Sequence, residues 1–249
     1  LNQRIEATAP FISRKVWQEC AADVPPLAEG AVVYGGLDLS EVADLTALVL
    51  VSPVGDGPVW YVHPTFWLPG DGLREKAKAD RVPYDVWHKN GTLEAPAGRV
   101  IDYEFVAARL WELHQRYDLR KIAFDRWNFR HLRPWLLKSG FTEGQVDGDG
   151  AIFAPLGQGF QSMSPALRDL ETALLTGRIA HGGHPVLEMC AHNAGGQTDP
   201  AGNRKLTKAK SRGRIDGMVA LVMAMSVAGT WQAVEAGGSY MDAAGLVVL

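Results

Sequence analysis

Three aspartates stand in segments of the chain that are otherwise apolar. Asp38 interrupts the β-rich run AVVYGGLDLS, Asp125 ends the run LysIleAlaPheAsp, and Asp216 opens an apolar C-terminal helix. A buried carboxylate is costly unless it is paired or binds a metal. Taken together, these positions predict a metal site in which Asp38, Asp125 and Asp216 are both the catalytic and the metal-binding residues.

Considered singly, each aspartate also has a structural alternative. Asp38 could accept bonds from amides of the link at 40–44, Asp125 could cap the next helix, and Asp216 could complement the helix dipole. Phosphodiester hydrolysis would explain the group, because a pair of divalent ions about 3.5–4 Å apart activates water and stabilises the departing oxygen. Oxygen ligands suit Mg²⁺ or Mn²⁺, and three aspartates are the minimum set for two such ions.

A basic segment precedes Asp216. Six cations lie between positions 204 and 214 without an intervening acid, and four of them are candidate DNA-binding residues: Lys205, Lys208, Lys210 and Arg212. The alternative is a solvated loop, the commoner situation for a run of charge. The net charge of −3 argues against a protein that holds nucleic acid by bulk positive charge, but an acidic metal site lowers the total by itself.

Two further clusters are weaker candidates. The side chains of His181, His184, Cys190 and His192 are competent zinc ligands, but their spacing matches no standard zinc pattern. We therefore favour surface or hydrogen-bonded histidines. Glu171 could be a fourth acid near the metals, although a solvated helix face is the commoner place for such a residue.

The elements that would position these residues alternate along the chain. Three consecutive antiparallel strands are followed by alternating helices and strands, which predicts an α/β fold with a mixed sheet flanked by helices. Asp102 is the expected N-cap of one helix, and Ser162 or Ser164 that of another. The predicted strands are 31–40, 45–51, 59–68, 121–125 and 151–155, with a late hairpin at a ProAlaGlyAsn turn. The predicted helices are 13–22, 73–79, 83–89, one from Asp102, 130–138, 164–176, one after Pro185, and 214–228.

Composition limits the class of protein. The 249 residues are 47% hydrophobic, which is enough for a sizeable core. No apolar run reaches the roughly 18 residues that a membrane helix needs. The two distant cysteines, Cys20 and Cys190, give no disulfide framework, so a reducing cytoplasm fits best. Residues 1–30 are expected to be a lead-in from a preceding domain, and 31–249 the main domain.

Several of these segments carry a family resemblance. They are GLDLSEVADLTALVLV, the strand-end Asp125 with its following ArgTrp, HGGHPVLEMCAHNA with Asn193, and DPAGNRKLTKAKSRGRIDGMVALVMA. In this order, they resemble the nuclease domain of the large terminase subunit of tailed bacteriophages. The resemblance covers about residues 31–229, and residues 1–30 are similar to the lead-out from that family's ATPase domain.

The resemblance implies a ribonuclease H-like fold that uses Mg²⁺ or Mn²⁺ to cut concatemeric double-stranded viral DNA during packaging. It implies that Asp38 is the first-strand ligand, Asp125 the ligand ending the fourth strand, and Asp216 the helix-borne ligand. Asp44 matches the family's second acid, for which we expect an orienting or turn-capping role, and Asn193 is a second supporting residue. The implied partners are the portal or procapsid and the small terminase subunit, in the host cytoplasm.

Two alternatives stay open. Another ribonuclease H-like enzyme, such as a resolvase, integrase or transposase, would share the fold, because one scaffold hosts many activities. A non-catalytic module that binds DNA or the capsid would keep the fold without the metals. The chain has no GxxxxGK[ST] phosphate loop, so we expect it to cut DNA without translocating it.

Overall fold

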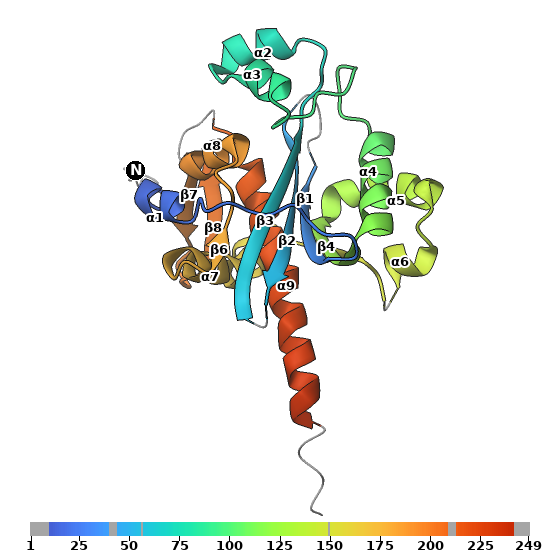
Figure 1. Cartoon of the computed structure of the whole chain (residues 1–249), viewed down its shortest axis with the longest axis vertical. Helices are drawn as coiled ribbons and strands as arrows, with labels where there is room; N and C mark the ends of the chain where they lie inside the picture. Colours follow the sequence, from blue (N-terminus) through green and yellow to red (C-terminus); the bar gives the residue numbers. More distant parts are fainter. Residues whose placement is uncertain (1–9, 40–43, 56, 149, 209–212, 242–249) are drawn as a thin grey trace, which may run out of the picture.

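A six-stranded mixed sheet forms the centre of the molecule (Figure 1). The computed structural model describes residues 10–39, 44–55, 57–148, 150–208 and 213–241. The strands follow the order β5-β4-β1-β2-β3-β6. Their bounds are β1 Val32–Asp38, β2 Thr46–Val54, β3 Gly57–Trp67, β4 Asp118–Asp125, β5 Phe153–Leu156 and β6 Ile179–Ala180.

The sheet has the predicted combination of directions. Strands β1, β2 and β3 form an antiparallel meander, whereas β4 lies parallel to β1, and β5 lies parallel to β4. The two-residue strand β6, which was not predicted, adds a parallel edge to β3. The predicted mixed sheet of three antiparallel strands followed by parallel strands is therefore confirmed.

Helices cover both faces of the sheet (Figure 1). Alternate residues of β2 point to opposite faces, because Val49 and Val51 join the core that contains α9 while Leu48 and Leu50 join the core that contains α4 and α5. A strand buried on both faces is apolar throughout. The helices are α1 Arg14–Glu19, α2 Leu73–Asp80, α3 Tyr84–Lys89, α4 Tyr103–Arg116, α5 Arg126–Ser139, α6 Glu143–Asp147, α7 Phe160–Leu175, α8 Pro185–Asn193 and α9 Asp216–Met241.

Helix α9 lies directly against β1 because Gly36 has no side chain. A Cβ at Gly36 would lie 1.9 Å from the Ala220 carbonyl oxygen and 2.6 Å from the Ala224 nitrogen. From Ala220 back to Asp216 the helix rises about 6 Å, and from Gly36 to Asp38 the strand rises about 7 Å. The two elements run in opposite directions, so the first turn of α9 meets the last residue of β1.

Two local structures complete the fold. The helices α2 and α3 lie beyond the end of the sheet where β3 finishes, as predicted for 73–79 and 83–89 (Figure 1). A separate hairpin joins β7 (Ala194–Thr198) to β8 (Arg204–Lys208). Its turn is held by Asp199, which accepts backbone hydrogen bonds from Ala201 and Asn203. The predicted hairpin is therefore confirmed.

The predicted cap of the seventh helix is wrong. The helix begins at Phe160 after Gly159, with Pro165 inside it, so neither Ser162 nor Ser164 is the N-cap. The Ser164 hydroxyl instead accepts a hydrogen bond from the backbone nitrogen of Arg204, at the start of β8. Asp102, in contrast, caps α4 as predicted and accepts a hydrogen bond from the Glu104 nitrogen.

The segment before β1 packs on the sheet domain. Phe11 and Trp17 are buried, and the Phe11 nitrogen donates to the Ala194 carbonyl. The division of the chain into a lead-in at 1–30 and a domain at 31–249 stays a prediction.

None of the helices among the described residues combines the length and the apolar character that crossing a bilayer requires.

Candidate active site

The fold brings Asp38, Asp125 and Asp216 to one end of the sheet. Strands β1 and β4 are parallel and Leu37 lies opposite Phe124, so Asp38 and Asp125 end neighbouring strands at the same edge. Asp216 arrives from the helix side, where α9 begins beside the end of β1. Each of the three side chains is partly buried. Residues separated by as many as 178 positions in the chain are therefore neighbours.

The electrostatics of Asp38 place it between the other two acids. Burial raises the pKa of Asp38 well above its ordinary value, and the negative charges of Asp216 and then Asp125 raise it further. A hydrogen bond from Gln158 Nε2 to Asp38 Oδ1, 3.4 Å long, and the charge of Lys208 act in the opposite direction. Burial also raises the pKa of Asp216. The end of the sheet is thus an electronegative site that favours a cation.

One oxygen at this site has no partner in the part of the chain that the structure describes. Asp216 Oδ2 is buried and accepts no hydrogen bond there. An orphaned buried carboxylate oxygen is costly, and a hard cation would satisfy it. Among the described residues, however, no three His, Cys, Asp or Glu side chains converge tightly enough to surround one metal ion. The three aspartates share an edge rather than one coordination point.

Arg214 fixes the chain that leads into Asp216. Its guanidinium forms ion pairs with Asp44 and with Asp80, the latter at 2.8 Å between Nη2 and Oδ2. Its Nε donates to the Tyr84 hydroxyl at 2.7 Å, and its backbone carbonyl accepts from Asn193 Nδ2 at 3.2 Å. The Arg214 side chain is only 11% exposed. Arg214, two residues before Asp216, therefore connects α9 to the segments that carry its four partners.

Asp44 and Asn193 are both part of this arrangement. Asp44 also accepts a hydrogen bond from the Leu45 nitrogen, at the turn between β1 and β2. A Cβ at Gly213 would lie 2.8 Å from Asn193 Cγ, so the approach to α9 passes closely over the Asn193 side chain. Both residues contact the entry to α9, but their functional roles stay predictions.

The basic segment is divided among several environments. Lys208 is exposed and close enough to Asp38 and Asp216 to lower the pKa of both. Lys205 instead lies over the Phe160 ring, with Nζ 4.6 Å from its centroid. Lys210 and Arg212, also predicted to bind DNA, lie outside the described residues. Of the described candidates, Lys208 alone faces the acidic edge.

Glu171 and the four candidate zinc ligands have other contacts. Glu171 accepts two hydrogen bonds from Arg204, which attaches β8 to α7. The ring of His181 stacks on the ring of Trp17, and its Nε2 donates a hydrogen bond to the backbone carbonyl of Trp17. Burial lowers the pKa of His184 to about 4. Cys190 is a buried free thiol, and His192 lies 3.9 Å from Glu188.

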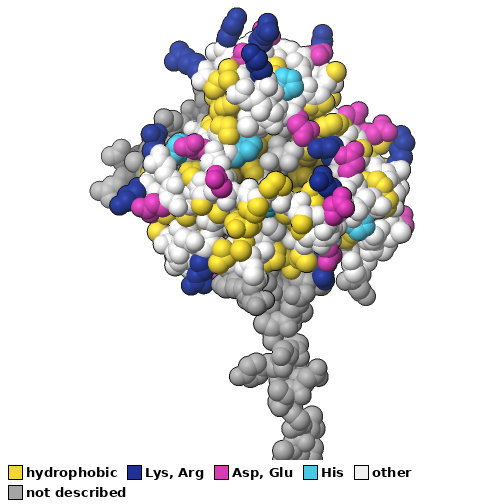
Figure 2. Space-filling view, in the orientation of Figure 1, with side chains coloured by type: hydrophobic (Ala, Val, Ile, Leu, Met, Phe, Trp, Pro, Cys, Tyr) yellow, Lys and Arg dark blue, Asp and Glu magenta, His cyan; other side chains and the backbone are white. Residues whose placement is uncertain are grey.

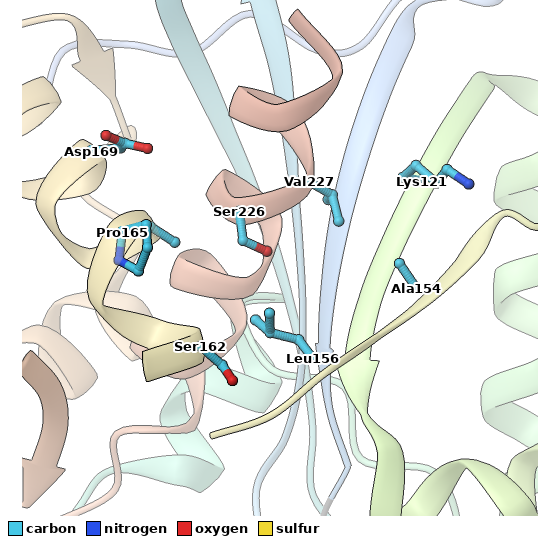
Figure 3. A pocket seen from close by; sticks show the side chains of 9 residues that line it. Lys121, Ala154, Leu156, Ser162, Pro165, Asp169, Ser226 and Val227 are labelled. Atoms are coloured by element: carbon cyan, nitrogen blue, oxygen red, sulfur yellow. The ribbon is translucent and has the colours of Figure 1, made fainter. Parts of the chain in front are cut away.

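A hollow of about 370 Å³ is a separate feature. Figure 3 shows it beside α9, with Ser162 and Asp169 of α7 on one side and Lys121 of β4 on the other. Val227, which lines it, comes eleven residues after Asp216, or about 16 Å along a helix. The hollow is therefore not the aspartate site.

The sequence analysis missed the contact of Gln158 with Asp38 and the contacts of Arg214 with Asp80 and Tyr84. Gln158 is 120 positions from Asp38, and Arg214 is 134 positions from Asp80. No local pattern marks such pairs. The one signal available was Arg214 itself, a cation two residues before a buried acid.

Comparison with known proteins supplies the family. Residues 1–231 match the family described as the terminase large subunit, endonuclease domain. The chain belongs to this family. It is 45% identical over 242 residues to the large terminase subunit of Enterobacteria phage HK97, a match that covers 97% of the chain and 46% of that protein. It is 24% identical over 259 residues to protein YmfN of Escherichia coli K12, covering 99% of the chain and 54% of that protein.

Solved terminases share the architecture. The crystal structure of the HK97 large terminase superimposes with a TM-score of 0.80 over 91% of this chain and 45% of that one. The large terminase nuclease from thermophilic phage G20c, 13% identical, gives a TM-score of 0.56 over 88% of this chain and 98% of that one, which shows the shared fold alone. The ribonuclease H-like fold is thereby confirmed. This terminase chain spans about half the length of the HK97 and YmfN proteins.

Proposed function

We propose that this terminase domain is a metal-dependent endonuclease that cuts double-stranded DNA. The observation that carries the proposal is the group of three partly buried aspartates at one sheet edge, with Asp38 repelled by both others and Asp216 Oδ2 lacking a partner among the described residues. Such a group is costly for a fold and useful for binding divalent cations. Membership of the endonuclease family supports the same reading.

The metals we propose are Mg²⁺ or Mn²⁺, with two ions in the working site. The G20c terminase nuclease has been solved with bound magnesium and with bound cobalt. Asp38 would contact both ions, because it is the acid that interacts with both Asp125 and Asp216. When bound, such ions supply Lewis-acid stabilisation of the phosphate and a water of lowered pKa.

The chain's own residues would orient the substrate and the ligands. Lys208 lies beside the acids and is exposed, so it can contact a phosphate next to the one that is cut. Lys205, Lys210 and Arg212 are proposed to extend this DNA contact. Asp44 and Asn193 are proposed to act through Arg214 and the backbone before α9, which sets the direction of the Asp216 carboxylate.

The biological substrate we propose is the concatemeric DNA of a tailed bacteriophage, cut during packaging in the host cytoplasm. The proposed partners are the portal or procapsid and the small terminase subunit. These proposals rest on family membership, and the chain represents about half of its relatives' length.

Cleavage of supercoiled plasmid by the purified chain tests the function. We expect nicking with Mn²⁺ or Mg²⁺, none with EDTA, and a loss of at least roughly a hundredfold in Asp38→Ala, Asp125→Ala and Asp216→Ala. The exposed Asp23 provides a matched control, and Asp23→Ala should cut normally. Near-normal cutting by any one of the first three variants would remove that aspartate from the site. DNA binding without any metal-dependent cutting would favour a non-catalytic module instead.

A further inference from the structure

The α2–α3 segment has no role in the proposed chemistry, yet it is attached to the site. Asp80 and Tyr84 both bind Arg214, two residues before Asp216. The backbone from Arg214 to Asp216 spans at most about 7.6 Å. Helix α2, with eight residues, is about 12 Å long. Both lengths are short beside one turn of DNA, about 34 Å. Helix α2 therefore lies within one turn's length of a duplex cut at the aspartates.

One side of α2 carries a stripe of cations, which we define as Arg74, Lys78 and Arg81. Arg74 and Lys78 are one helical turn apart, and Arg81 follows directly after the helix. All three side chains are exposed, whereas Leu73 and Ala77 on the adjacent side are buried. In Figure 2, Lys and Arg side chains gather over the end of the molecule that α2 and α3 form.

The stripe is not neutralised by its surroundings. Neither Arg74, Lys78 nor Arg81 forms an ion pair with any other residue that the structure describes. Of the acids on the same segment, Asp80 is engaged by Arg214, and Asp71 accepts a hydrogen bond from the Gly98 nitrogen.

The remaining acids, Glu75 and Asp85, lie elsewhere on the segment. Glu75 is rotated by about 100° from Arg74 around α2, and it lies three residues before Lys78, with which it forms no ion pair in the described structure. The hollow of about 810 Å³ between α2 and α3 is lined by Glu75 and Asp85 as well as by Arg74 and Lys89. That mixture of charges makes the hollow a poor anion site. Arg74 borders both the hollow and the stripe, whereas Lys78 and Arg81 do not line the hollow.

Arg81 occupies a backbone conformation that favours glycine. Its φ is +57°, and it is the one non-glycine residue with positive φ in the described part of the chain. A left-handed residue other than Gly or Asn costs about 1 kcal/mol, and glycine is the usual choice just after a helix. Arg81 thus bears a backbone cost at a position where its exposed side chain presents a cation.

We propose that the stripe of Arg74, Lys78 and Arg81 is a second DNA-contacting surface, which grips the phosphate backbone of the duplex beside the cutting site. Three cations spaced along one helix can follow consecutive phosphates without reading bases. The ion pair between Arg214 and Asp80 and the hydrogen bond from Arg214 to Tyr84 hold this surface in a fixed position relative to Asp216. The inference rests on the proposed function, since it names a further contact for the same DNA.

The test compares two triple variants that remove the same charge. Arg74→Gln, Lys78→Gln and Arg81→Gly are combined in the stripe variant; Arg81→Gly also relieves the left-handed backbone, so the fold should be retained. The control combines Arg14→Gln, Arg168→Gln and Arg178→Gln, three exposed cations without ion pairs among the described residues. Thermal unfolding checks that both are folded.

Binding of a duplex of roughly 30 base pairs, about three turns, is measured in EDTA at several salt concentrations. Each phosphate contact contributes about 0.9 to the slope of log affinity against log salt. We expect the slope to fall by roughly 2–3 in the stripe variant and to stay unchanged in the control. In cleavage, the stripe variant should have a higher KM for DNA and an unchanged kcat.

Three outcomes would be decisive. An unchanged salt slope and KM in the stripe variant would overturn the inference while leaving the proposed nuclease intact. An equal loss in the control would also overturn it, because the contact would not be local. If the unaltered chain binds duplex but never cuts it, the proposed function fails, and the reduced slope of the stripe variant would still establish the surface.

Discussion

At the scale of single residues, the acidic edge stores an unfavourable interaction. Asp38 is partly buried and lies near two further carboxylates, and among the described residues Gln158 and Lys208 act against its raised pKa. Active sites commonly hold such destabilising groups because the charge is needed for function. Removing the charge should therefore improve stability and impair metal binding together.

Asp38→Asn should raise the melting temperature of the metal-free protein by about 2–4 °C near pH 8, equivalent to roughly 1 kcal/mol for a chain of this size. The sign follows from the raised pKa of Asp38: the folded state holds the proton more tightly than the unfolded state, so this stability is present at low pH and lost as pH rises. The gain of the variant should disappear on acidification.

Stabilisation by added metal is a second test of the role of Asp38. Mn²⁺ should raise the melting temperature of the unaltered chain by preferential binding to the folded state, and should have little effect on Asp38→Asn. Asp23→Asn, a change at an exposed position, should respond to Mn²⁺ as the unaltered chain does. Equal stabilisation of all three proteins would exclude Asp38 as a ligand.

Arg214→Met should loosen the entry to α9 and detach α2–α3. The change leaves Asp44 and Asp80 without their cation. We expect it to lower the free energy of unfolding by about 1–3 kcal/mol, a value already reduced for solvent screening because both carboxylates are partly exposed. Hydrogen exchange over 73–89 should accelerate, and cleavage should fall although the three aspartates remain. Arg214→Lys, which retains the charge but not the planar fork, should give an intermediate effect. Unaltered exchange at 73–89 would show that other contacts hold the segment.

At the scale of elements, the site depends on how closely α9 approaches β1. Gly36 permits backbone contact between them, and Gly217 permits Phe66 and Leu187 to close over the first turn of the helix. Helix α9 contributes more buried residues to the core on this side of the sheet than any other single element. The position of Asp216 is therefore set by glycines as much as by its own side chain.

Gly36→Ala should destabilise the protein by about 3 kcal/mol or more, because the added Cβ would lie 1.9 Å from the backbone of α9 and neither element can yield easily. Denaturant unfolding measures the change. Gly144→Ala is the matched control: its Cβ meets nothing within 4 Å and it lies in a helix, so it should be neutral or slightly stabilising. A neutral Gly36→Ala would mean that α9 does not rest on β1 as described.

At the scale of the whole molecule, partly buried histidines make stability depend on pH. Burial lowers the pKa of His63 and of His184 to about 4 each. An unfolded histidine has a pKa near 6.5, so between about pH 6.5 and 4 the unfolded chain binds more protons and stability falls with falling pH. Protonation of Asp38 acts in the opposite direction, so variants rather than absolute values must be compared.

His184→Gln should therefore flatten the loss of stability on acidification by about 1–3 kcal/mol at pH 4. Melting temperatures of the variant and of the unaltered chain, measured from neutral pH to about pH 4, provide the comparison. Parallel curves would mean that His184 is protonated as readily in the folded protein as in the unfolded chain.

Much of this molecule was predictable from short-range patterns. The antiparallel strands, the helices at α2 and α3 and the Asp102 cap each depend on residues a few positions apart, where propensity and periodicity act. The predicted cap at Ser162 or Ser164 failed because α7 begins earlier, at Phe160 after Gly159, and continues through Pro165. The grouping of the three aspartates was predictable as well, since a carboxylate in an apolar element is anomalous by itself, and their catalytic and metal-binding roles stay predictions.

The sequence by itself determined the α/β class, the family resemblance and the three acids, because these are properties of local composition and order. The tertiary structure alone decided that Asp38 lies between the others, that Gln158 reaches it, and that Arg214 ties Asp80 and Tyr84 to the entry of α9. Those contacts join residues at least 87 positions apart. Their partners are selected by the packing of α9 on the sheet, which no local pattern encodes.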